Sequence, residues 1–228
     1  MPVALITGSA RGIGAAVAAR LRDNGWDVVA ADRDPSPVGR PVICDVADEA
    51  SVVALIAGIR ISEGRLDALI CNAGINIRKP LADLSLAEWS SVLGTNLTST
   101  FLLVRAAEPL LRAANGAVVT IASTRAHMSE PYTEAYAASK GGLVALTHAL
   151  AISLGPEVRV NCVSPGWIAT KGPAPSAMEH AFHPAGRVGT AEDVAALVAF
   201  LVGPDSRFIT GSEFVIDGGV TRKMIYPD

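Results

Sequence analysis

Short apolar runs alternate with longer helix-forming stretches along the whole chain, and this alternation constrains the fold more than any other feature. Alternation of this kind predicts a parallel sheet with right-handed crossovers and helices on both of its faces. We predict strands at residues 3–7, 26–31, 41–44, 66–71, 117–122, 158–163 and 213–216. We predict helices at residues 12–24, 48–62, 85–114, 134–154 and 190–202, with strain near Gly94 and Pro109 in the longest. The fold class is therefore α/β, with a doubly wound seven-stranded parallel sheet.

Composition favours a single domain over residues 1–228. Half of the 228 residues are hydrophobic, which suits one well-buried core, and only 5% are aromatic. No linker, repeat or low-complexity stretch divides the chain. The crossover between residues 32 and 41 is short and rich in proline and glycine, so we predict no full helix there.

Charge and cysteine content limit the partners and the compartment. The net charge is −3 and no basic tract occurs, so we expect neither nucleic acid nor an anionic membrane as a partner. No apolar run reaches the length of a membrane span, and residues 1–6 lead into a strand without the features of a secretion signal. The three cysteines, Cys44, Cys71 and Cys162, lie in apolar segments. We predict that they are reduced and buried, in a cytoplasmic protein.

Neither a metal site nor a hydrolase site is predicted. His180 and His183 are three residues apart, but Pro184 would break a helix there and no acidic or cysteine ligand stands nearby in the required pattern. Ser123 lacks the G-x-S-x-G elbow of a serine hydrolase.

Glycines gather at residues 7–14 (T-G-S-A-R-G-I-G), directly after the first predicted strand and at the start of the first helix. Glycine lets the backbone turn tightly and approach a pyrophosphate, while the helix N-terminus supplies N–H donors. The spacing is G-x-x-x-G-x-G rather than G-x-G-x-x-G. Its position on a strand–turn–helix unit favours a dinucleotide site, and a tight turn that only permits close helix–sheet packing is the alternative.

Acidic residues at two predicted strand ends bear on the choice of dinucleotide. Asp32 ends the second strand, where a carboxylate accepts hydrogen bonds from ribose hydroxyls and repels a 2′-phosphate. Arg11 and Arg33 argue the other way, because a guanidinium can pair with a phosphate. We predict NAD over NADP, since repulsion beside the ribose outweighs a flexible surface arginine. A turn residue is the alternative role for Asp32. Asp45, after the third strand, either meets the adenine or begins a turn.

Tyr136 and Lys140 lie four residues apart in a predicted helix, so their side chains share a face. A free tyrosine titrates near pH ~10, and a fixed positive charge nearby lowers its pKa. The pair is a plausible acid/base device for taking a proton from an alcohol or giving one to a carbonyl. An ordinary surface pair is the alternative for this motif taken alone.

These motifs, with several others, resemble those of the short-chain dehydrogenase/reductase family over essentially the whole chain. Residues 7–14 are similar to its T-G-x-x-x-G-x-G loop, and residues 71–74 (C-N-A-G) to its N-N-A-G motif, with Cys71 in place of the first asparagine. The further matches are Asn96 in a T-N-L triplet, Ser123 thirteen residues before Tyr136, the Tyr136–Lys140 pair, P-G at 165–166 and D-G-G at 217–219. Each motif is weak alone, but seven in the family's order and spacing are specific.

The resemblance implies a single-domain Rossmann fold and an oxidoreductase that transfers a hydride between NAD, or less favourably NADP, and a secondary alcohol or ketone. It implies that Tyr136 is the acid/base and that Lys140 lowers its pKa and binds the nicotinamide ribose. Ser123 would hold the substrate oxygen, and Asn96 would position a water that links Lys140 to solvent. No metal is needed.

The cofactor-binding set joins the residue-based predictions to those that the resemblance implies. The resemblance places Asp45 and Val46 at the adenine, and Ile168 and Thr170 at the nicotinamide carboxamide. The full set is Gly8, Arg11, Gly12, Ile13, Gly14, Asp32, Asp45, Val46, Asn72, Ala73, Gly74, Tyr136, Lys140, Pro165, Gly166, Ile168 and Thr170.

The substrate side is less defined. The segment of about 170–187, rich in proline and glycine, follows the sixth strand and is the natural lid, although it is short for the family. Residues that flank the site, and are candidates for the substrate pocket or for simple loop packing, are His127, Met128, Pro131, Tyr132 and Trp167. A 3-oxoacyl reductase and a sugar or polyol dehydrogenase both remain open.

Three other functions fit less well. A non-catalytic dinucleotide sensor or scaffold would keep the glycine loop and lose the acid/base set, whereas all four catalytic positions are filled here. Epimerases and dehydratases among the extended relatives need a longer substrate domain. An enoyl reductase would want a wider tyrosine–lysine spacing than Tyr132 or Tyr136 offers to Lys140.

The chain is also predicted to form a homodimer or homotetramer. The alanine- and leucine-rich faces of the helices at 85–114 and 134–154 are too apolar to stay in water. The family is commonly dimeric or tetrameric.

Overall fold

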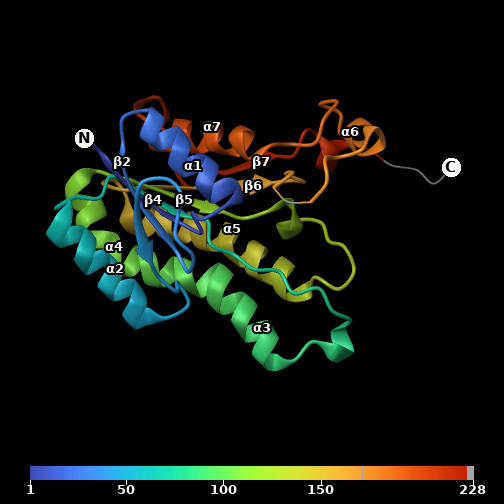
Figure 1. Cartoon of the computed structure of the whole chain (residues 1–228), viewed down its shortest axis with the longest axis horizontal. Coiled ribbons are helices and arrows are strands. Elements are labelled where there is room, and N and C mark those ends of the chain that lie inside the picture. Colours follow the sequence, from blue (N-terminus) through green and yellow to red (C-terminus); the bar gives the residue numbers. More distant parts are fainter. Residues whose placement is uncertain (171, 225–228) are drawn as a thin grey trace.

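The computed structural model describes residues 1–170 and 172–224 and contains the predicted seven-stranded parallel sheet (Figure 1). The strand order is β3-β2-β1-β4-β5-β6-β7, and every neighbouring pair is parallel. The strands are β1 Val3–Thr7, β2 Asp27–Asp32, β3 Arg40–Ile43, β4 Ala68–Cys71, β5 Ala117–Ile121, β6 Arg159–Pro165 and β7 Glu213–Ile216. The predicted sheet is confirmed, with strand ends displaced by one or two residues.

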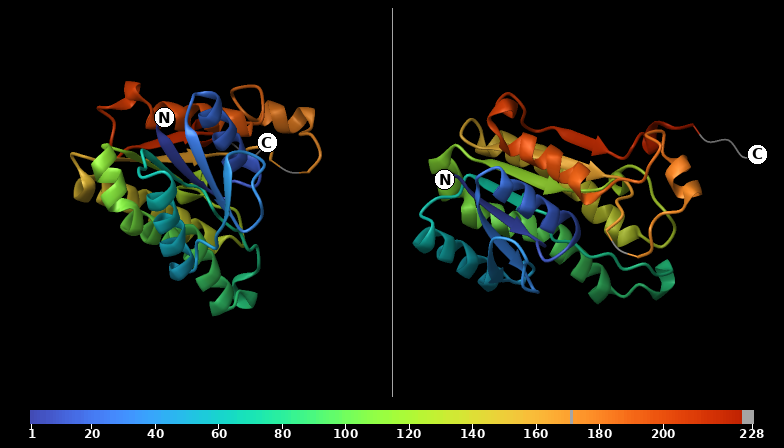
Figure 2. Two further views of the ribbon diagram at one scale, coloured as in Figure 1. Left: turned by 60° about the vertical axis from the view of Figure 1, so that its left-hand side comes forward. Right: turned by 45° about the horizontal axis from the view of Figure 1, so that its top comes forward.

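Helices cover both faces of this sheet, as predicted (Figures 1 and 2). They are α1 Gly12–Asp23, α2 Glu49–Ser62, α3 Leu86–Leu93, α4 Ser99–Ala114, α5 Glu134–Leu154, α6 Ala177–Phe182 and α7 Ala191–Val202. Short 3₁₀ turns occupy Leu81–Asp83, Thr124–Ala126, Pro204–Ser206 and Val220–Arg222. The helices α1 and α7 lie on one face, and α2, α4 and α5 lie on the other.

The two faces bury separate hydrophobic cores, which explains why the strands read as continuous apolar runs. In β1, Leu5 belongs to the core under α2 and α4, while Ile6 belongs to the core under α1 and α7. Both side chains are fully buried. Alternate residues of a strand point to opposite faces, so a strand covered on both sides has no polar alternation.

The structure does not contain the single continuous helix predicted over residues 85–114. The segment is divided into α3, a π-helical turn at Gly94–Thr98, and α4. The irregularity falls at the predicted Gly94, while Pro109 lies inside a helix that continues past it. Single π turns within helices are frequent at functional sites, and this one carries Asn96.

The crossover between β2 and β3 has no helix, as predicted, and it is fastened to the glycine-rich loop instead. The Ser36 hydroxyl donates to the Ser9 carbonyl at 3.0 Å. This contact keeps the short loop against the start of α1.

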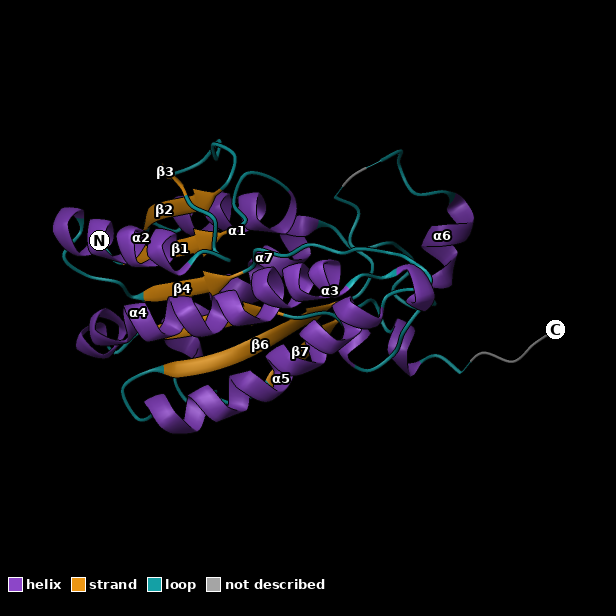
Figure 3. Ribbon diagram, turned by 90° about the horizontal axis from the view of Figure 1, so that it is seen from below, coloured by secondary structure: helices purple, strands orange, loops and turns teal. Residues whose placement is uncertain are grey.

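The carboxyl ends of the strands and the longer loops lie on the side of α6 (Figure 3). The predicted lid at 170–187 contains α6, which begins with a capping box between Ser176 and Glu179. Position 171 of this segment, and positions 225–228 at the end of the chain, lie outside the described residues.

Within the described residues, α5 is the one helix that is long and apolar enough to cross a membrane by length and composition alone. One third of its apolar stretch, 33%, is buried inside the chain. The buried side includes Lys140, Leu143 and Thr147, which lie toward β5 and β6. The helix therefore belongs to the packed core on that side.

Candidate active site

A cavity of about 1060 Å³ opens at the carboxyl ends of β4, β5 and β6. It joins residues from the glycine-rich loop, the loop after β4, the start of α5 and the lid. The predicted site residues that line it are Arg11, Ile13, Asn72, Gly74, Ser123, Tyr136, Lys140, Pro165, Gly166, Ile168 and Thr170. The predicted site residues that do not line it are Gly8, Gly12, Gly14, Asp32, Asp45, Val46, Ala73 and Asn96.

The glycine-rich loop is held by the segment that follows β4. The Asn72 side-chain amide donates to the carbonyls of Thr7 at 2.9 Å and Gly8 at 3.1 Å. The Thr7 hydroxyl in turn accepts from the backbone N–H groups of Asn72 and Ala73. Asn72 and Ala73 therefore fix the shape of the loop, and Asn72 also faces the cavity.

The start of α1 fits a dinucleotide pyrophosphate. Arg11 is the N-cap residue, yet no side chain caps this helix. The first N–H groups of a helix lack intrahelical acceptors, so those at Gly12, Ile13 and Gly14 are available to an anion. A dinucleotide would be held here by backbone N–H groups, with Asn72 and Gly74 alongside.

Asp32 has a structural role at the end of β2, in line with the turn role left open by the sequence. Its carboxylate accepts the backbone N–H of Ala10 at 2.9 Å and that of Asp34 at 3.2 Å. It thus ties the end of β2 to the glycine-rich loop. Arg11 forms an exposed ion pair with Asp34 at 3.2 Å, a partner that sequence reasoning missed. That contact reduces the positive charge available to a 2′-phosphate.

Asp45 and Val46 follow β3. The Asp45 carboxylate accepts the backbone N–H of Ala47 at 3.0 Å, which is the turn role left open by the sequence. Val46 is buried.

Asn96 is buried within the π-helical turn and is fully engaged with neighbouring groups. Its side-chain oxygen accepts the N–H of Ile75 at 2.8 Å, and its amide donates to the Ile75 carbonyl at 2.9 Å and the Ser139 hydroxyl at 3.0 Å. The Ser139 hydroxyl donates to the Tyr136 carbonyl at 2.7 Å. Asn96 therefore links the loop after β4 to the helical turn that carries Tyr136.

Lys140 and Tyr136 lie on one face of α5, as their spacing predicts. The Lys140 ammonium is 5.4 Å from the centre of the Tyr136 ring and donates to the Ile121 carbonyl at 2.7 Å. Lys140 is only 4% exposed. Ser123 follows β5 and accepts the backbone N–H of Arg125 at 3.2 Å. The acid/base candidates and the serine thus face one cavity.

Burial dominates the pKa of both residues. It lowers the pKa of Lys140 to about 8, with a smaller opposing effect from Cys162. It raises the pKa of Tyr136, while a hydrogen bond to Ser123 and the positive charge of Arg125 lower it by less. The lowering of the tyrosine pKa expected from Lys140 is not found in the chain itself, because the ammonium lies over the ring and burial outweighs the favourable contacts.

The lowered pKa of Lys140 predicts a pH-dependent stability. Below about pH 8 the Lys140 ammonium is charged and buried in the folded chain, which costs free energy, whereas in the unfolded chain it is in water. The free energy of unfolding should therefore rise as the pH increases from about 8 toward the unfolded pKa of about 10.5. Replacing Lys140 with methionine removes this dependence. Between about pH 7 and about pH 10, the unfolding free energy of the wild type should increase by about 2 kcal/mol relative to that of the variant, as measured by urea titrations.

Comparing the two proteins at each pH cancels the contributions of Tyr136 and the cysteines, which titrate in both. A constant difference across this range would contradict a buried lysine ammonium.

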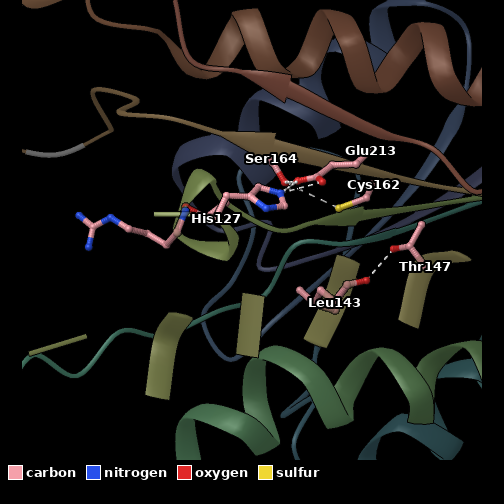
Figure 4. Close-up of polar contacts among 8 residues, drawn as sticks. His127, Leu143, Thr147, Cys162, Ser164 and Glu213 are labelled. Carbon is pink, nitrogen blue, oxygen red and sulfur yellow. Dashed lines mark hydrogen bonds and ion pairs between the residues drawn. The ribbon is translucent and has the colours of Figure 1, made fainter. Parts of the chain in front are cut away.

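Of the flanking residues, Met128 and Trp167 line the cavity, whereas His127, Pro131 and Tyr132 do not. His127 turns toward β7, where its Nε2 lies 2.8 Å from both carboxylate oxygens of Glu213 (Figure 4). The Ser164 hydroxyl donates to the same carboxylate at 2.5 Å. This contact anchors the loop after β5 outside the cavity.

The predicted buried, unpaired cysteines are confirmed for Cys44, Cys71 and Cys162. His183 is buried, with its ring tilted against that of Trp167 and edge-on to that of Phe182, and its Nδ1 lies 2.9 Å from the Glu179 carbonyl oxygen. Across the described part of the chain, no group of three or more His, Cys, Asp or Glu side chains is arranged to hold a metal ion.

Comparison with known proteins adds a family to this geometry. A family model described as "Enoyl-(Acyl carrier protein) reductase" matches residues 8–221. An uncharacterized oxidoreductase of Thermotoga maritima is 42% identical, over 99% of this chain and 98% of its own length. D-threitol dehydrogenase of Mycolicibacterium smegmatis is 37% identical, over 97% of this chain and 93% of its own. This chain belongs to the short-chain dehydrogenase/reductase family.

A solved structure agrees with the fold. The ligand-free aldohexose dehydrogenase of Thermoplasma acidophilum superposes with a TM-score of 0.93 at 28% identity, covering 100% of this chain and 97% of its own. As a short-chain dehydrogenase/reductase, the protein is an NAD(P)-dependent oxidoreductase that acts on CH–OH groups. Its substrates are small alcohols or ketones.

Proposed function

We propose that the protein is an NAD-dependent dehydrogenase that oxidises a secondary alcohol of a polyol or sugar to a ketone. The observation that carries this proposal is that Ser123, Tyr136 and Lys140 line one cavity together with Asn72 and the start of α1. The predicted catalytic and cofactor-binding roles of these residues are part of the proposal.

In this mechanism, Tyr136 takes the proton of the substrate hydroxyl, and Ser123 donates a hydrogen bond to the substrate oxygen. When bound, the dinucleotide supplies the hydride acceptor. The buried ammonium of Lys140, 5.4 Å from the centre of the Tyr136 ring, stabilises the phenolate form of Tyr136 that accepts this proton. Asn96 joins the loop after β4 to α5 through its hydrogen bonds to Ile75 and Ser139. Its predicted role, to position a water that links Lys140 to solvent, is part of the proposal.

The walls of the cavity favour a substrate rich in hydroxyl groups. The polar side chains of Asn76, Ser129 and Glu130 line the cavity and together offer hydrogen-bond donors and acceptors, and the aromatic side chains of Trp167 and Phe182 also line it. Aromatic faces and paired polar groups suit the alternating CH and OH surfaces of polyols. The names of two relatives, D-threitol dehydrogenase and aldohexose dehydrogenase, are in keeping with this class.

The test is NAD reduction by the purified protein over a panel of polyols, aldoses, simple secondary alcohols and 3-hydroxyacyl thioesters. The proposal expects the highest kcat/KM among polyols or sugars. A preference for the thioester would favour the 3-oxoacyl reductase instead. Binding of NAD without turnover of any member would favour a sensor.

Preference for NAD is proposed from Asp32 and the pairing of Arg11 with Asp34. Replacing Asp32 with serine should raise the ratio of kcat/KM for NADP to that for NAD by about tenfold or more, because the repulsion of a 2′-phosphate is removed. Affinity for both cofactors should fall, since the contact to Ala10 is also lost. The matched control is Asp27→Ser at the exposed start of the same strand, which should leave the ratio unchanged. A wild type that already prefers NADP would contradict the proposal.

A homodimer or homotetramer is also proposed. Its support is the exposed apolar surface of α4 and α5, where Phe101 is 45% exposed and Ile152 is 85% exposed. Light scattering at micromolar concentration tests it, and a monomer would contradict it. The three unpaired cysteines support a cytoplasmic location.

A further inference from the structure

The loop between β5 and α5 forms one wall of the cavity and carries charged side chains into it. This loop follows Ser123 directly and ends at Thr133, the residue before α5. Its lining residues are Thr124, Arg125, Met128, Ser129 and Glu130. Two of these, Arg125 and Glu130, are charged.

Arg125 and Glu130 form an ion pair within this wall. The Arg125 guanidinium lies 2.6 Å from one carboxylate oxygen of Glu130, and Arg78 lies 3.1 Å from the other oxygen on the outer side. The side chain of Arg125 is 24% exposed, against 56% for Arg78. Among the described residues, the side chain of Arg125 has no other hydrogen-bond partner. Its remaining N–H donors are therefore left to the cavity.

This pair lies beside the reacting centre. Arg125 is two residues after Ser123 and donates its backbone N–H to the Ser123 hydroxyl. Both Arg125 and Tyr136 line the cavity, and the positive charge of Arg125 lowers the pKa of Tyr136. A substrate held at Ser123 and Tyr136 would therefore share the cavity with this pair.

The pair is held in place before any substrate arrives. The Thr133 hydroxyl donates to the Glu130 carbonyl at 2.7 Å, and the Lys79 N–H donates to the Tyr132 carbonyl at 3.2 Å. On the far side, His127 is fixed to Glu213 (Figure 4). Fixed partners on both sides of the pair reduce the entropy lost on binding.

A guanidinium and a carboxylate side by side match one chemical group best. A hydroxyl can accept from Arg125 and donate to Glu130 at once, whereas a substrate carboxylate would be repelled by Glu130. An alkyl group would cover both charges without replacing their hydrogen bonds to water, which costs binding energy.

We infer that Arg125 and Glu130 recognise a hydroxyl on the carbon adjacent to the reacting carbon, so that the enzyme selects vicinal diols. This inference rests on the proposed function and narrows its substrate class. The pair is thus a specificity-determining site for a second hydroxyl group.

The test compares butane-2,3-diol with butan-2-ol, which differ by the one hydroxyl concerned, in NAD reduction by the full chain. The wild type should favour the diol in kcat/KM by about 100-fold or more, because a site built to bind a hydroxyl rejects the analogue that lacks it. Arg125→Met and Glu130→Gln should each reduce this ratio by about tenfold or more. Arg125→Lys, which keeps a charge and a donor, should retain part of it.

Arg22→Met is the matched control, because Arg22 lies on α1, pairs with Asp23 and does not line the cavity. It should leave the ratio unchanged. Turnover of both alcohols with similar kcat/KM in the wild type, or an unchanged ratio in both site variants, overturns the inference while the dehydrogenase remains. Absence of NAD reduction with every alcohol rejects the proposed function and the inference with it. Circular dichroism and NAD affinity identify a variant that has failed to fold. The diol-to-alcohol ratios of the remaining variants then test the inference.

Discussion

Replacing Tyr136 with phenylalanine is expected to lower kcat/KM for alcohol oxidation by about 1,000-fold. The change removes one oxygen atom and leaves the ring that contacts Lys140, so the fold and the cavity should persist. A positioned acid/base contributes roughly 10²- to 10⁴-fold to such a reaction, and no other phenol lines the cavity within the described residues. The affinity for NAD, measured by fluorescence titration, should change by less than about fivefold.

The matched control is Tyr132→Phe. Tyr132 is 48% exposed, lies on the loop before α5 and does not line the cavity. The same loss of a hydroxyl should leave kcat/KM within about twofold of the wild type. Turnover by the Tyr136 variant within about tenfold of the wild type would remove the tyrosine from the mechanism.

The pH profile adds an independent check. Burial raises the pKa of Tyr136, so the phenol is protonated at neutral pH in the chain itself. Oxidation needs the deprotonated form as a base, so kcat/KM should rise with pH until Lys140, with a pKa of about 8, loses the charge that stabilises the phenolate. Arg125→Met should move this rise to higher pH, because the positive charge of Arg125, which lowers the tyrosine pKa, is lost.

The sheet was predictable because its strands are covered on both faces. Runs such as residues 3–7 and 117–121 are fully buried, so no polar alternation or competing helical period obscures them. The capping box at Ser85 and Glu88 likewise forms from residues three apart in sequence. Features that depend on local sequence and on burial were therefore read correctly.

Contacts between distant segments were not predictable in the same way. The π-helical turn at 94–98 accompanies the bonding of Asn96 to Ile75, twenty-one residues earlier. The tie between Asp32 and Ala10, and the pairing of Arg11 with Asp34, depend on how two irregular loops meet. Nothing in the sequence around Arg125 marks it as part of the cavity, because the loop after β5 has no periodic pattern.

The order of the motifs along the chain nevertheless predicted the position of the cavity. Parallel strands deliver their carboxyl ends to one edge, so residues placed after β1, β4, β5 and β6 had to converge there. The exceptions are residues such as Gly14, which shape the loop from behind. Such a residue matters because the neighbouring atoms leave no room for a side chain, and it contributes no functional group.

Replacing Gly14 with alanine should abolish detectable NAD binding and destabilise the fold. A Cβ atom at this position would lie 2.1 Å from the Gly8 carbonyl oxygen and 2.6 Å from the Asn72 side-chain nitrogen. Both atoms belong to the hydrogen bond that fixes the glycine-rich loop, so neither can move without opening it. We expect NAD affinity to fall by about 100-fold or more and the unfolding free energy to fall by about 3 kcal/mol.

Helix propensity alone predicts that Gly14→Ala increases the unfolding free energy, because alanine in a helix is more favourable than glycine by about 1 kcal/mol. Gly58→Ala in α2 isolates that term, since no atom lies within 4 Å of its would-be Cβ outside its own helix and chain neighbours. The control should gain up to about 1 kcal/mol in urea unfolding and bind NAD normally. If both variants were stabilised equally, the close approach of α1 to Gly8 and Asn72 would be wrong. Opposite signs for one chemical change in two helices would establish that the loop geometry, rather than glycine flexibility in general, supports the dinucleotide site.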